Sequence, residues 1–134
     1  MNYSVTKIIS FAYGHRLLKY DGKCKYLHGH NGRAEITLRT GKLDGRGMVV
    51  DFSDIKRTIG SFINEQLDHK ILLCKEDPLV PVLKKMNEPH FVMEDNPTAE
   101  NISRLIYRQA KSMKLPVASV KLWETDTSFA FYEG

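Results

Sequence analysis

Apolar and polar residues alternate in the first forty residues of the chain, which is the pattern of half-buried β-strands. One alternating segment covers residues 3–15 and a second covers residues 30–40. A third strand is predicted over residues 117–124, and a fourth over residues 128–133 follows it after a short turn. Because side chains alternate along a strand, one face of each of these segments is expected to be buried.

Between the two pairs of strands, apolar residues recur at the three- and four-residue spacing of amphipathic helices. One helix is predicted over residues 53–67. A second begins at residues 98–100, and Pro116 closes the segment that contains it. We expect residues 71–97, which carry four prolines, to form a long irregular excursion with one short helix that starts at residues 77–78.

The predicted elements follow the order β-β-α-α-β-β within a single domain of residues 1–134. Hairpins at both ends and helices between them favour an α+β fold, with a four-stranded antiparallel sheet and both helices on one face. Such a sheet leaves two edge strands without partners. Coverage of these edges by neighbouring subunits is favoured, so we expect a homo-oligomer.

Composition and charge narrow the classes of partner. With 42% hydrophobic and 27% charged residues, the chain has the composition of an ordinary globular protein. The net charge of +4 suits a polyanionic small molecule, and no nucleic-acid partner is expected because no basic run is interleaved with aromatic residues. The sequence shows neither a signal peptide nor a membrane-spanning segment, so a cytoplasmic protein without a membrane partner is expected. Its two cysteines are expected to stay unpaired, and Cys74 to be buried as a small hydrophobe.

Three histidines stand at the ends of the apolar faces of the first two strands. His28 and His30 point to the same side of their strand, and His15 ends the apolar register of the first strand. Three neutral imidazoles with an open fourth position are the ligand set of a catalytic zinc ion, whereas lone histidines are more often solvated or packed in a core. Cys24 lies just outside the pair. It either faces whatever the metal holds or closes a structural site as fourth ligand, and spacing alone leaves both possibilities open.

Two further positions carry groups that are unusual for their place. Glu124 ends an apolar register, where a carboxylate needs a partner. It could accept two parallel hydrogen bonds from an amino-pyrimidinone edge, or it could turn to solvent. Asp68 and His69 could form a carboxylate-oriented imidazole for proton transfer, which requires a turn because adjacent side chains otherwise point apart. The alternative for His69 is a helix C-terminal histidine favoured by the helix dipole.

These residues belong to six short motifs that occur in order over nearly the whole chain. The motifs are Phe11-x-x-x-His15, Cys24-x-x-x-His28-Gly29-His30, Met48-Val49-Val50-Asp51-Phe52, Leu67-Asp68-His69-Lys70, Pro97-Thr98-Ala99-Glu100-Asn101 and Trp123-Glu124-Thr125. Together they resemble the 6-pyruvoyl-tetrahydropterin synthase / 6-carboxytetrahydropterin synthase family. The resemblance implies the tunnelling fold (T-fold), a homohexamer built as a dimer of trimers, and active sites at the interfaces between subunits.

The resemblance also implies a role for each candidate residue. The implied ligands of a catalytic zinc ion are His15, His28 and His30. The implied proton-transfer groups are Cys24, as the thiolate that abstracts a proton, and the pair Asp68 and His69. The implied substrate-binding residues are Glu124, which would anchor the pterin ring, with Thr98 and Glu100 as supporting contacts.

The gap of three residues between Cys24 and His28 resembles the bacterial carboxy-forming branch, because the pyruvoyl-forming animal enzymes have a longer gap. That branch converts dihydroneopterin triphosphate to 6-carboxytetrahydropterin with release of acetaldehyde and triphosphate, on the way to 7-deazapurines such as queuosine. Two departures from the family pattern bear on the substrate. Tyr13 stands where the family usually has a small residue, and the excursion over residues 71–97 is longer than in compact members.

The sequence therefore predicts a zinc-dependent lyase that acts on a dihydropterin triphosphate to form 6-carboxytetrahydropterin. Elimination to the 6-pyruvoyl product from the same substrate is the alternative within the family. Two alternatives lie outside this chemistry: a non-catalytic pterin- or purine-binding protein, and a small zinc-stabilised interaction module. The interaction module leaves Glu124, at the end of an apolar face, unexplained.

Overall fold

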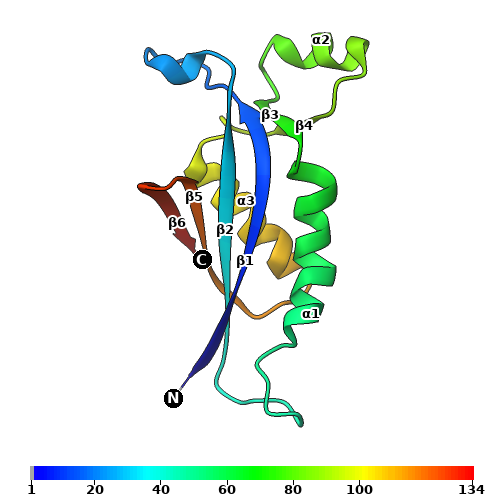
Figure 1. The fold of residues 1–134 in the computed structure, drawn as a ribbon, viewed down its shortest axis with the longest axis vertical. Coiled ribbons are helices and arrows are strands. Elements are labelled where there is room, and N and C mark those ends of the chain that lie inside the picture. Colours follow the sequence, from blue (N-terminus) through cyan, green and yellow to red (C-terminus); the bar gives the residue numbers. More distant parts are fainter. Residues whose placement is uncertain (1) are drawn as a thin grey trace.

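A computed structural model describes residues 2–134 as a twisted sheet covered on one face by helices (Figure 1). The strands of the sheet are β1 (Tyr3–His15), β2 (His28–Thr40), β3 (Lys70–Cys74), β4 (His90–Met93), β5 (Val117–Thr125) and β6 (Ser128–Glu133). They lie in the order β4-β3-β1-β2-β5-β6. The pairs β1–β2, β2–β5 and β5–β6 are antiparallel. Strand β3 runs parallel to both of its neighbours, β1 and β4.

The helical segments include one long helix with unusual turns. In chain order they are η1 (Lys23–Lys25), α1 (Phe52–Ile55), η2 (Lys56–Gly60), η3 (Ile63–Leu67), α2 (Leu79–Met86) and α3 (Ala99–Ser112). The π-helical segments η2 and η3 continue α1, so the three form a single helix, and the prediction of a helix over residues 53–67 is confirmed. Asp51 caps its start, because the Asp51 carboxylate accepts a hydrogen bond of 2.9 Å from the backbone nitrogen of Ser53.

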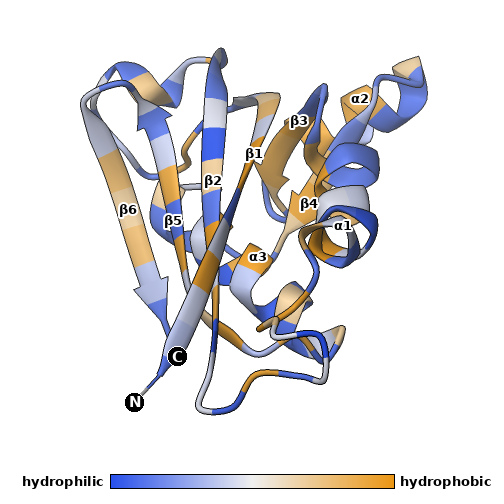
Figure 2. Ribbon diagram, turned by 60° about the horizontal axis from the view of Figure 1, so that its bottom comes forward, coloured by the Kyte–Doolittle hydropathy of each residue, from blue (hydrophilic) through white to orange (hydrophobic). Residues whose placement is uncertain are grey.

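The sheet has two strands more than the four-stranded antiparallel sheet predicted from the sequence. The extra strands are β3, which begins at Lys70, and β4, and together they occupy part of residues 71–97, where an irregular excursion was expected. They are short apolar runs, which Figure 2 shows in the orange of hydrophobic residues. Parallel strands buried on both faces lose the alternation of apolar and polar residues, and a short apolar run by itself does not distinguish strand from helix or loop. The expected short helix in this region is confirmed as α2.

The core lies between the sheet and the two long helices, as expected for helices on one face. The predicted alternation of β2 holds, since Ala34, Ile36 and Leu38 are fully buried. The side chains that pack against them from the helices include Ile55, Ile59, Ile63, Ile102 and Ile106. Residues 49 and 50, just before α1, form bends and not a strand. The α+β arrangement, with helices on one face of the sheet, is therefore as predicted.

Both cysteines are free thiols, and Cys74 is buried, as expected. Within residues 2–134 no helix is both long enough and apolar enough to cross a membrane.

Candidate metal centre and ligand cavity

The antiparallel pairing of β1 with β2 brings the three predicted metal-binding histidines to one end of the sheet. His15 pairs directly with His28, and His30 pairs with Tyr13. One ring nitrogen of each histidine lies within 4.8 Å of the corresponding nitrogens of the other two. The Nε2 atoms of His15 and His28 are 3.0 Å apart. Nitrogens bound to one tetrahedral zinc ion lie at about 2.0–2.1 Å from the metal and therefore about 3.3 Å from one another, so the observed cluster is close to that spacing.

Backbone carbonyl groups fix the orientation of two of the three rings. Nδ1 of His15 lies 2.7 Å from the carbonyl oxygen of Pro97, and Nδ1 of His28 lies 2.7 Å from that of Tyr26. A carbonyl oxygen only accepts hydrogen bonds, so Nδ1 carries the proton in both rings and Nε2 presents a lone pair to the cluster. Histidines that bind metals commonly have this arrangement, because the bond at Nδ1 sets both tautomer and ring direction.

The third ring supplies the strongest sign that the cluster is built for a cation. Nε2 of His30 is buried and has no hydrogen-bond partner within residues 2–134. Such a buried, unpaired nitrogen costs about 1–3 kcal/mol, which a bound cation would offset. Burial lowers the pKa of His15 and of His30, and this keeps both rings in the neutral form that binds metals. The three histidines therefore fit a metal ion.

Glu124 projects from β5 toward the same cluster. Its Oε1 atom lies 3.7 Å from Nε2 of His30, and its Oε2 atom lies 4.0 Å from Nε2 of His15. The side chain is 26% exposed, so the carboxylate faces the histidines and is not turned wholly to solvent. Its negative charge raises the pKa of both rings and partly opposes the effect of burial. An acidic group thus stands beside the candidate metal position.

A cavity of about 590 Å³ opens next to the cluster. The predicted site residues that line it are His15, Cys24, Thr98, Glu100 and Glu124. Thr98 is the N-cap of α3, where its hydroxyl accepts a hydrogen bond of 3.1 Å from the backbone nitrogen of Asn101. Glu100 lies exposed in the first turn of the same helix. One chain therefore brings five of the nine predicted site residues to a single cavity.

Cys24 reaches this cavity because the connection between β1 and β2 folds back on itself. The backbone nitrogen of Leu17 donates a hydrogen bond of 2.9 Å to the carbonyl oxygen of Cys24. The Asn96 side chain bonds both the backbone nitrogen and the carbonyl oxygen of Leu18, at 2.9 and 2.8 Å. The thiol lies on the cavity wall but does not join the three-histidine cluster.

A second interaction that holds the connection between β1 and β2 is an ion pair that the sequence did not indicate. Arg16, directly after His15, donates from Nε to Oδ2 of Asp77 over 2.9 Å. Asp77 is almost fully buried, and it also accepts a hydrogen bond from the backbone nitrogen of Leu79 at the start of α2. The hydrogen bond from Arg16 lowers the pKa of Asp77. Residues 77–78 signalled a helix start, but no local pattern indicated a partner so distant in the chain.

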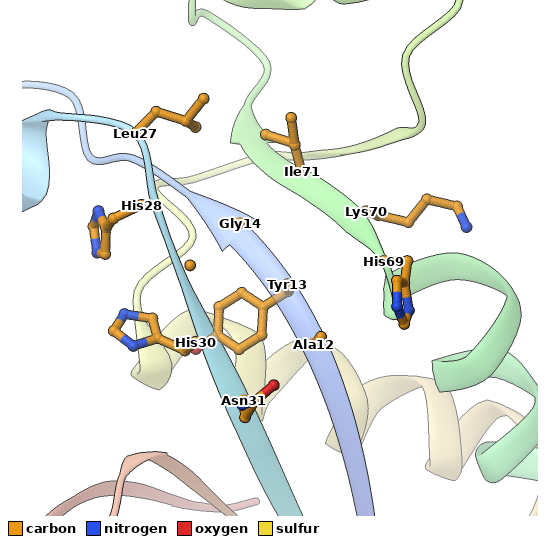
Figure 3. A pocket seen from close by; sticks show the side chains of 11 residues that line it. Ala12, Tyr13, Gly14, Leu27, His28, His30, Asn31, His69, Lys70 and Ile71 are labelled. Carbon is orange, nitrogen blue, oxygen red and sulfur yellow. The ribbon is translucent and has the colours of Figure 1, made fainter.

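Asp68 and His69 form the predicted pair, but away from the cavity that contains Cys24. Nδ1 of His69 lies 2.9 Å from Oδ2 of Asp68. The required turn is present, since His69 has a φ of 59° and its backbone nitrogen donates to the carbonyl oxygen of Ala12 over 2.7 Å. Figure 3 shows His69 across β1 from the histidine rings, beside Lys70 and Ile71. The His69 side chain is 80% exposed and lines a cavity with His28 and His30, whereas Cys24 lines a different cavity with His15.

Tyr13 is buried against the cluster of three histidines. Its ring centroid lies 5.2 Å from that of His15 and 5.7 Å from that of His30, and Figure 3 shows the ring extending from β1 toward His30. The hydroxyl is buried and lacks a hydrogen-bond partner among the residues that the structure describes. Burial, and secondarily the charge of Glu124, raise the pKa of this phenol, so the hydroxyl keeps its proton. The sequence marked Tyr13 only as a departure from a family pattern.

Comparison with known proteins gives a consistent result over the whole chain. The family model of 6-pyruvoyl tetrahydropterin synthase matches residues 4–134. The 6-carboxy-5,6,7,8-tetrahydropterin synthase of Haemophilus influenzae is 34% identical, with 98% of this chain and 99% of that protein covered. The enzyme of the same name from Aquifex aeolicus is 30% identical, with 99% of both chains covered. The 6-pyruvoyl tetrahydrobiopterin synthase of Pongo abelii is 33% identical over 97% of this chain and 90% of its own length.

Solved structures agree with these sequence matches. An uncharacterised protein of Wolinella succinogenes superposes with a TM-score of 0.82 at 25% identity, covering 100% of this chain and 99% of its own. The 6-pyruvoyl tetrahydropterin synthase of Caenorhabditis elegans superposes with a TM-score of 0.75 at 25% identity, covering 100% and 96%. The T-fold expected from the six motifs is thereby confirmed. The chain belongs to the 6-pyruvoyl tetrahydropterin synthase family.

Proposed function

We propose that this chain is a zinc-dependent 6-carboxy-5,6,7,8-tetrahydropterin synthase, which converts 7,8-dihydroneopterin triphosphate to 6-carboxytetrahydropterin with release of acetaldehyde and triphosphate. The observation that carries the proposal is one cavity lined by His15 of the three-histidine cluster, by Cys24 and by Glu124. The names of the relatives from Haemophilus influenzae and Aquifex aeolicus support the carboxy-forming reaction. The product would enter 7-deazapurine biosynthesis, such as that of queuosine, in the cytoplasm.

His15, His28 and His30 would hold the zinc ion, with two of the rings oriented by the carbonyl groups of Pro97 and Tyr26. Zinc bound there would supply Lewis acidity to the hydroxyl groups of the substrate side chain. Three protein ligands leave coordination room for such oxygens, which is the pattern of catalytic and not structural zinc sites. The position of Cys24 on the cavity wall, outside the histidine cluster, supports an open site.

Cys24 would remove the proton from the carbon that carries a side-chain hydroxyl group. The carbonyl oxygen of Cys24 accepts a hydrogen bond from the backbone nitrogen of Leu17, which is two residues after His15 in the sequence. This bond fixes the backbone of Cys24 near His15. Glu124 would recognise the pterin, because a carboxylate accepts two parallel hydrogen bonds from the amino and ring N–H groups of an amino-pyrimidinone. Thr98 and Glu100, on the same cavity wall, would support the ring.

Asp68 and His69 would complete proton transfer in a neighbouring subunit. Asp68 accepts the hydrogen bond from Nδ1 of His69 and leaves Nε2 free to relay a proton. Because His69 and Cys24 line different cavities of one chain, the pair would act at the cavity of another copy. This supports a homo-oligomer with active sites between subunits, for which we propose a hexamer formed as a dimer of trimers.

The test is zinc analysis together with product analysis. Purified protein is expected to contain one zinc ion per chain and to release acetaldehyde from 7,8-dihydroneopterin triphosphate. The relative from Pongo abelii supports an alternative in which the product retains a pyruvoyl side chain, and formation of that product without acetaldehyde would replace the first proposal by the second. Pterin binding without turnover would indicate a non-catalytic member of the family.

A further inference from the structure

Two polar groups lie at the edge of the histidine cluster, the buried hydroxyl of Tyr13 and the half-buried carboxylate of Glu124. The hydroxyl of Tyr13 is a protonated donor without an acceptor in residues 2–134, and Tyr13 as a whole is only 3% exposed. The carboxylate of Glu124 has His30 and His15 as its nearest charged neighbours, at 3.7 and 4.0 Å, which is beyond hydrogen-bond length. The hydroxyl can therefore donate a hydrogen bond, and the carboxylate can accept one.

The ring of Tyr13 extends across the neighbouring strand β2 in the direction of β5, the strand that carries Glu124. The ring starts on β1 and crosses β2 at Gly32, where an added side-chain carbon would lie 2.8 Å from Cε1 of Tyr13 and 3.5 Å from Cδ1 of Leu122. The missing side chain of Gly32 is therefore the space that the ring occupies. The tyrosine thus reaches over β2 toward β5.

The strand register then identifies what lies ahead of the ring. Leu122 of β5 pairs with Ala34 of β2. Gly32 and Glu124 each follow two residues farther toward the histidine end. The β5–β6 register shifts between Trp123 and Thr125, but the contacts of Glu124 with His15 and His30 place its side chain on the face that carries Tyr13. The ring that passes over Gly32 therefore points its hydroxyl toward the part of β5 that carries Glu124.

We propose that Tyr13 is a positioning residue for Glu124. When a metal ion occupies the three histidines, the hydroxyl of Tyr13 donates a hydrogen bond to the Glu124 carboxylate and fixes its direction. The histidines would bind the cation through their Nε2 lone pairs, and Glu124 would stay beside them with one carboxylate oxygen directed at the phenol. A carboxylate accepts up to about four hydrogen bonds, so one from Tyr13 leaves capacity for a ligand. On the proposed function, which this last step assumes, the fixed carboxylate meets the ring of a pterin in a single orientation.

The first experiment removes only the hydroxyl, with Tyr13→Phe, because the ring still fills the space over Gly32. Zinc content is expected to stay at the wild-type value, while the Kd for neopterin, followed by its fluorescence, rises about tenfold, as for loss of a hydrogen bond to a charged group. In turnover, KM is expected to rise with little change in kcat. Tyr107→Phe is the matched control, since Tyr107 is equally buried but lies in α3 against Tyr132, and its Kd should match the wild type. An unchanged Kd in Tyr13→Phe, or a loss of zinc, would overturn the proposal.

The second experiment tests the pair itself without any pterin. Urea unfolding of the zinc-loaded protein is measured for Tyr13→Phe, Glu124→Gln and the double variant. The effects of the two single changes on the unfolding equilibrium constant are expected to be non-additive by about tenfold, since both remove the same hydrogen bond. Additive effects, or a more stable Tyr13→Phe protein, would overturn the proposal, because removal of an unpaired hydroxyl is neutral or stabilising. If the coupling is present but wild-type protein binds no pterin, the proposed function fails while the role of Tyr13 stands.

Discussion

The histidine cluster and the Asp68–His69 pair lie near the same end of β1, yet they differ in nearly every physical respect. The cluster is largely buried, its rings are oriented by backbone carbonyls, and its members come from two strands in direct register. His69 is 80% exposed, takes a left-handed backbone conformation and depends on one carboxylate for its orientation. Burial prepares the cluster for a cation within one chain. Exposure leaves His69 accessible, so the two regions differ in what can reach them.

The largest expected effect is the loss of metal binding when one histidine of the buried cluster is replaced. His28→Ala removes one of three ligands, and the metal affinity is expected to fall by more than about 100-fold, with loss of turnover. Metal content by atomic emission and folding by far-ultraviolet circular dichroism check this. His90→Ala is the matched control, because His90 lies on β4 and only bonds the backbone carbonyl of Glu88. Full metal content in His28→Ala would show that the cluster is not the metal site.

Removal of the thiol separates metal binding from chemistry. Cys24→Ala is expected to keep its metal and to lose about 10²- to 10⁴-fold in turnover, the range for loss of a proton-transfer group. Acetaldehyde release and metal analysis on the same sample give both numbers. Cys74→Ala removes the other, buried cysteine and should retain turnover. If Cys24→Ala lost its metal instead, Cys24 would be a fourth ligand of a closed structural site.

Mixing two inactive variants sharpens the comparison between the regions. Cys24→Ala and His69→Ala chains, refolded together in equal amounts, are expected to recover about a quarter of the wild-type sites if each site takes its thiol and its imidazole from different chains. Activity should rise on mixing and be absent from each variant alone. Failure to regain activity, in mixtures shown to contain both chains in one oligomer, would mean that both groups act from the same chain.

The smallest expected effect concerns the connection that carries Cys24. Asp77→Asn weakens the tie to Arg16 and is expected to lower the stability at neutral pH by about 1–3 kcal/mol. The pKa of Asp77 is lowered in the folded protein, so the ionised carboxylate stabilises the fold above the ordinary value of about 4 and this contribution is lost as pH falls below it. Thermal melts of both proteins should differ most at neutral pH and converge in acid. Glu76→Gln, at an exposed neighbour, should melt like the wild type at every pH.

Local patterns predicted the elements whose faces differ in polarity. β1, β5 and β6 begin and end within one residue of the predicted bounds, and the helix after Asp51 and the start of α3 lie within one residue of their predicted positions. The two extra strands, β3 and β4, were missed because their short apolar runs do not alternate with polar residues, although Val92 of β4 is exposed. Such short runs, of which only the second lies between prolines, are shared with loops and short helices.

The sequence alone determined the chemistry that is available: three histidines in strand registers that end together, a cysteine before them, a carboxylate at an apolar strand end, and an Asp–His pair at a helix terminus. Periodicity carries this information because it fixes which side chains share a face. Only the tertiary structure decided which of these groups meet, since contacts such as Arg16 with Asp77, His15 with the Pro97 carbonyl, and the Tyr13 ring over Gly32 depend on how distant segments pack. Contacts between residues far apart in the chain produce no periodic pattern in the sequence. For this reason, only the folded structure showed that His69 and Cys24 line different cavities.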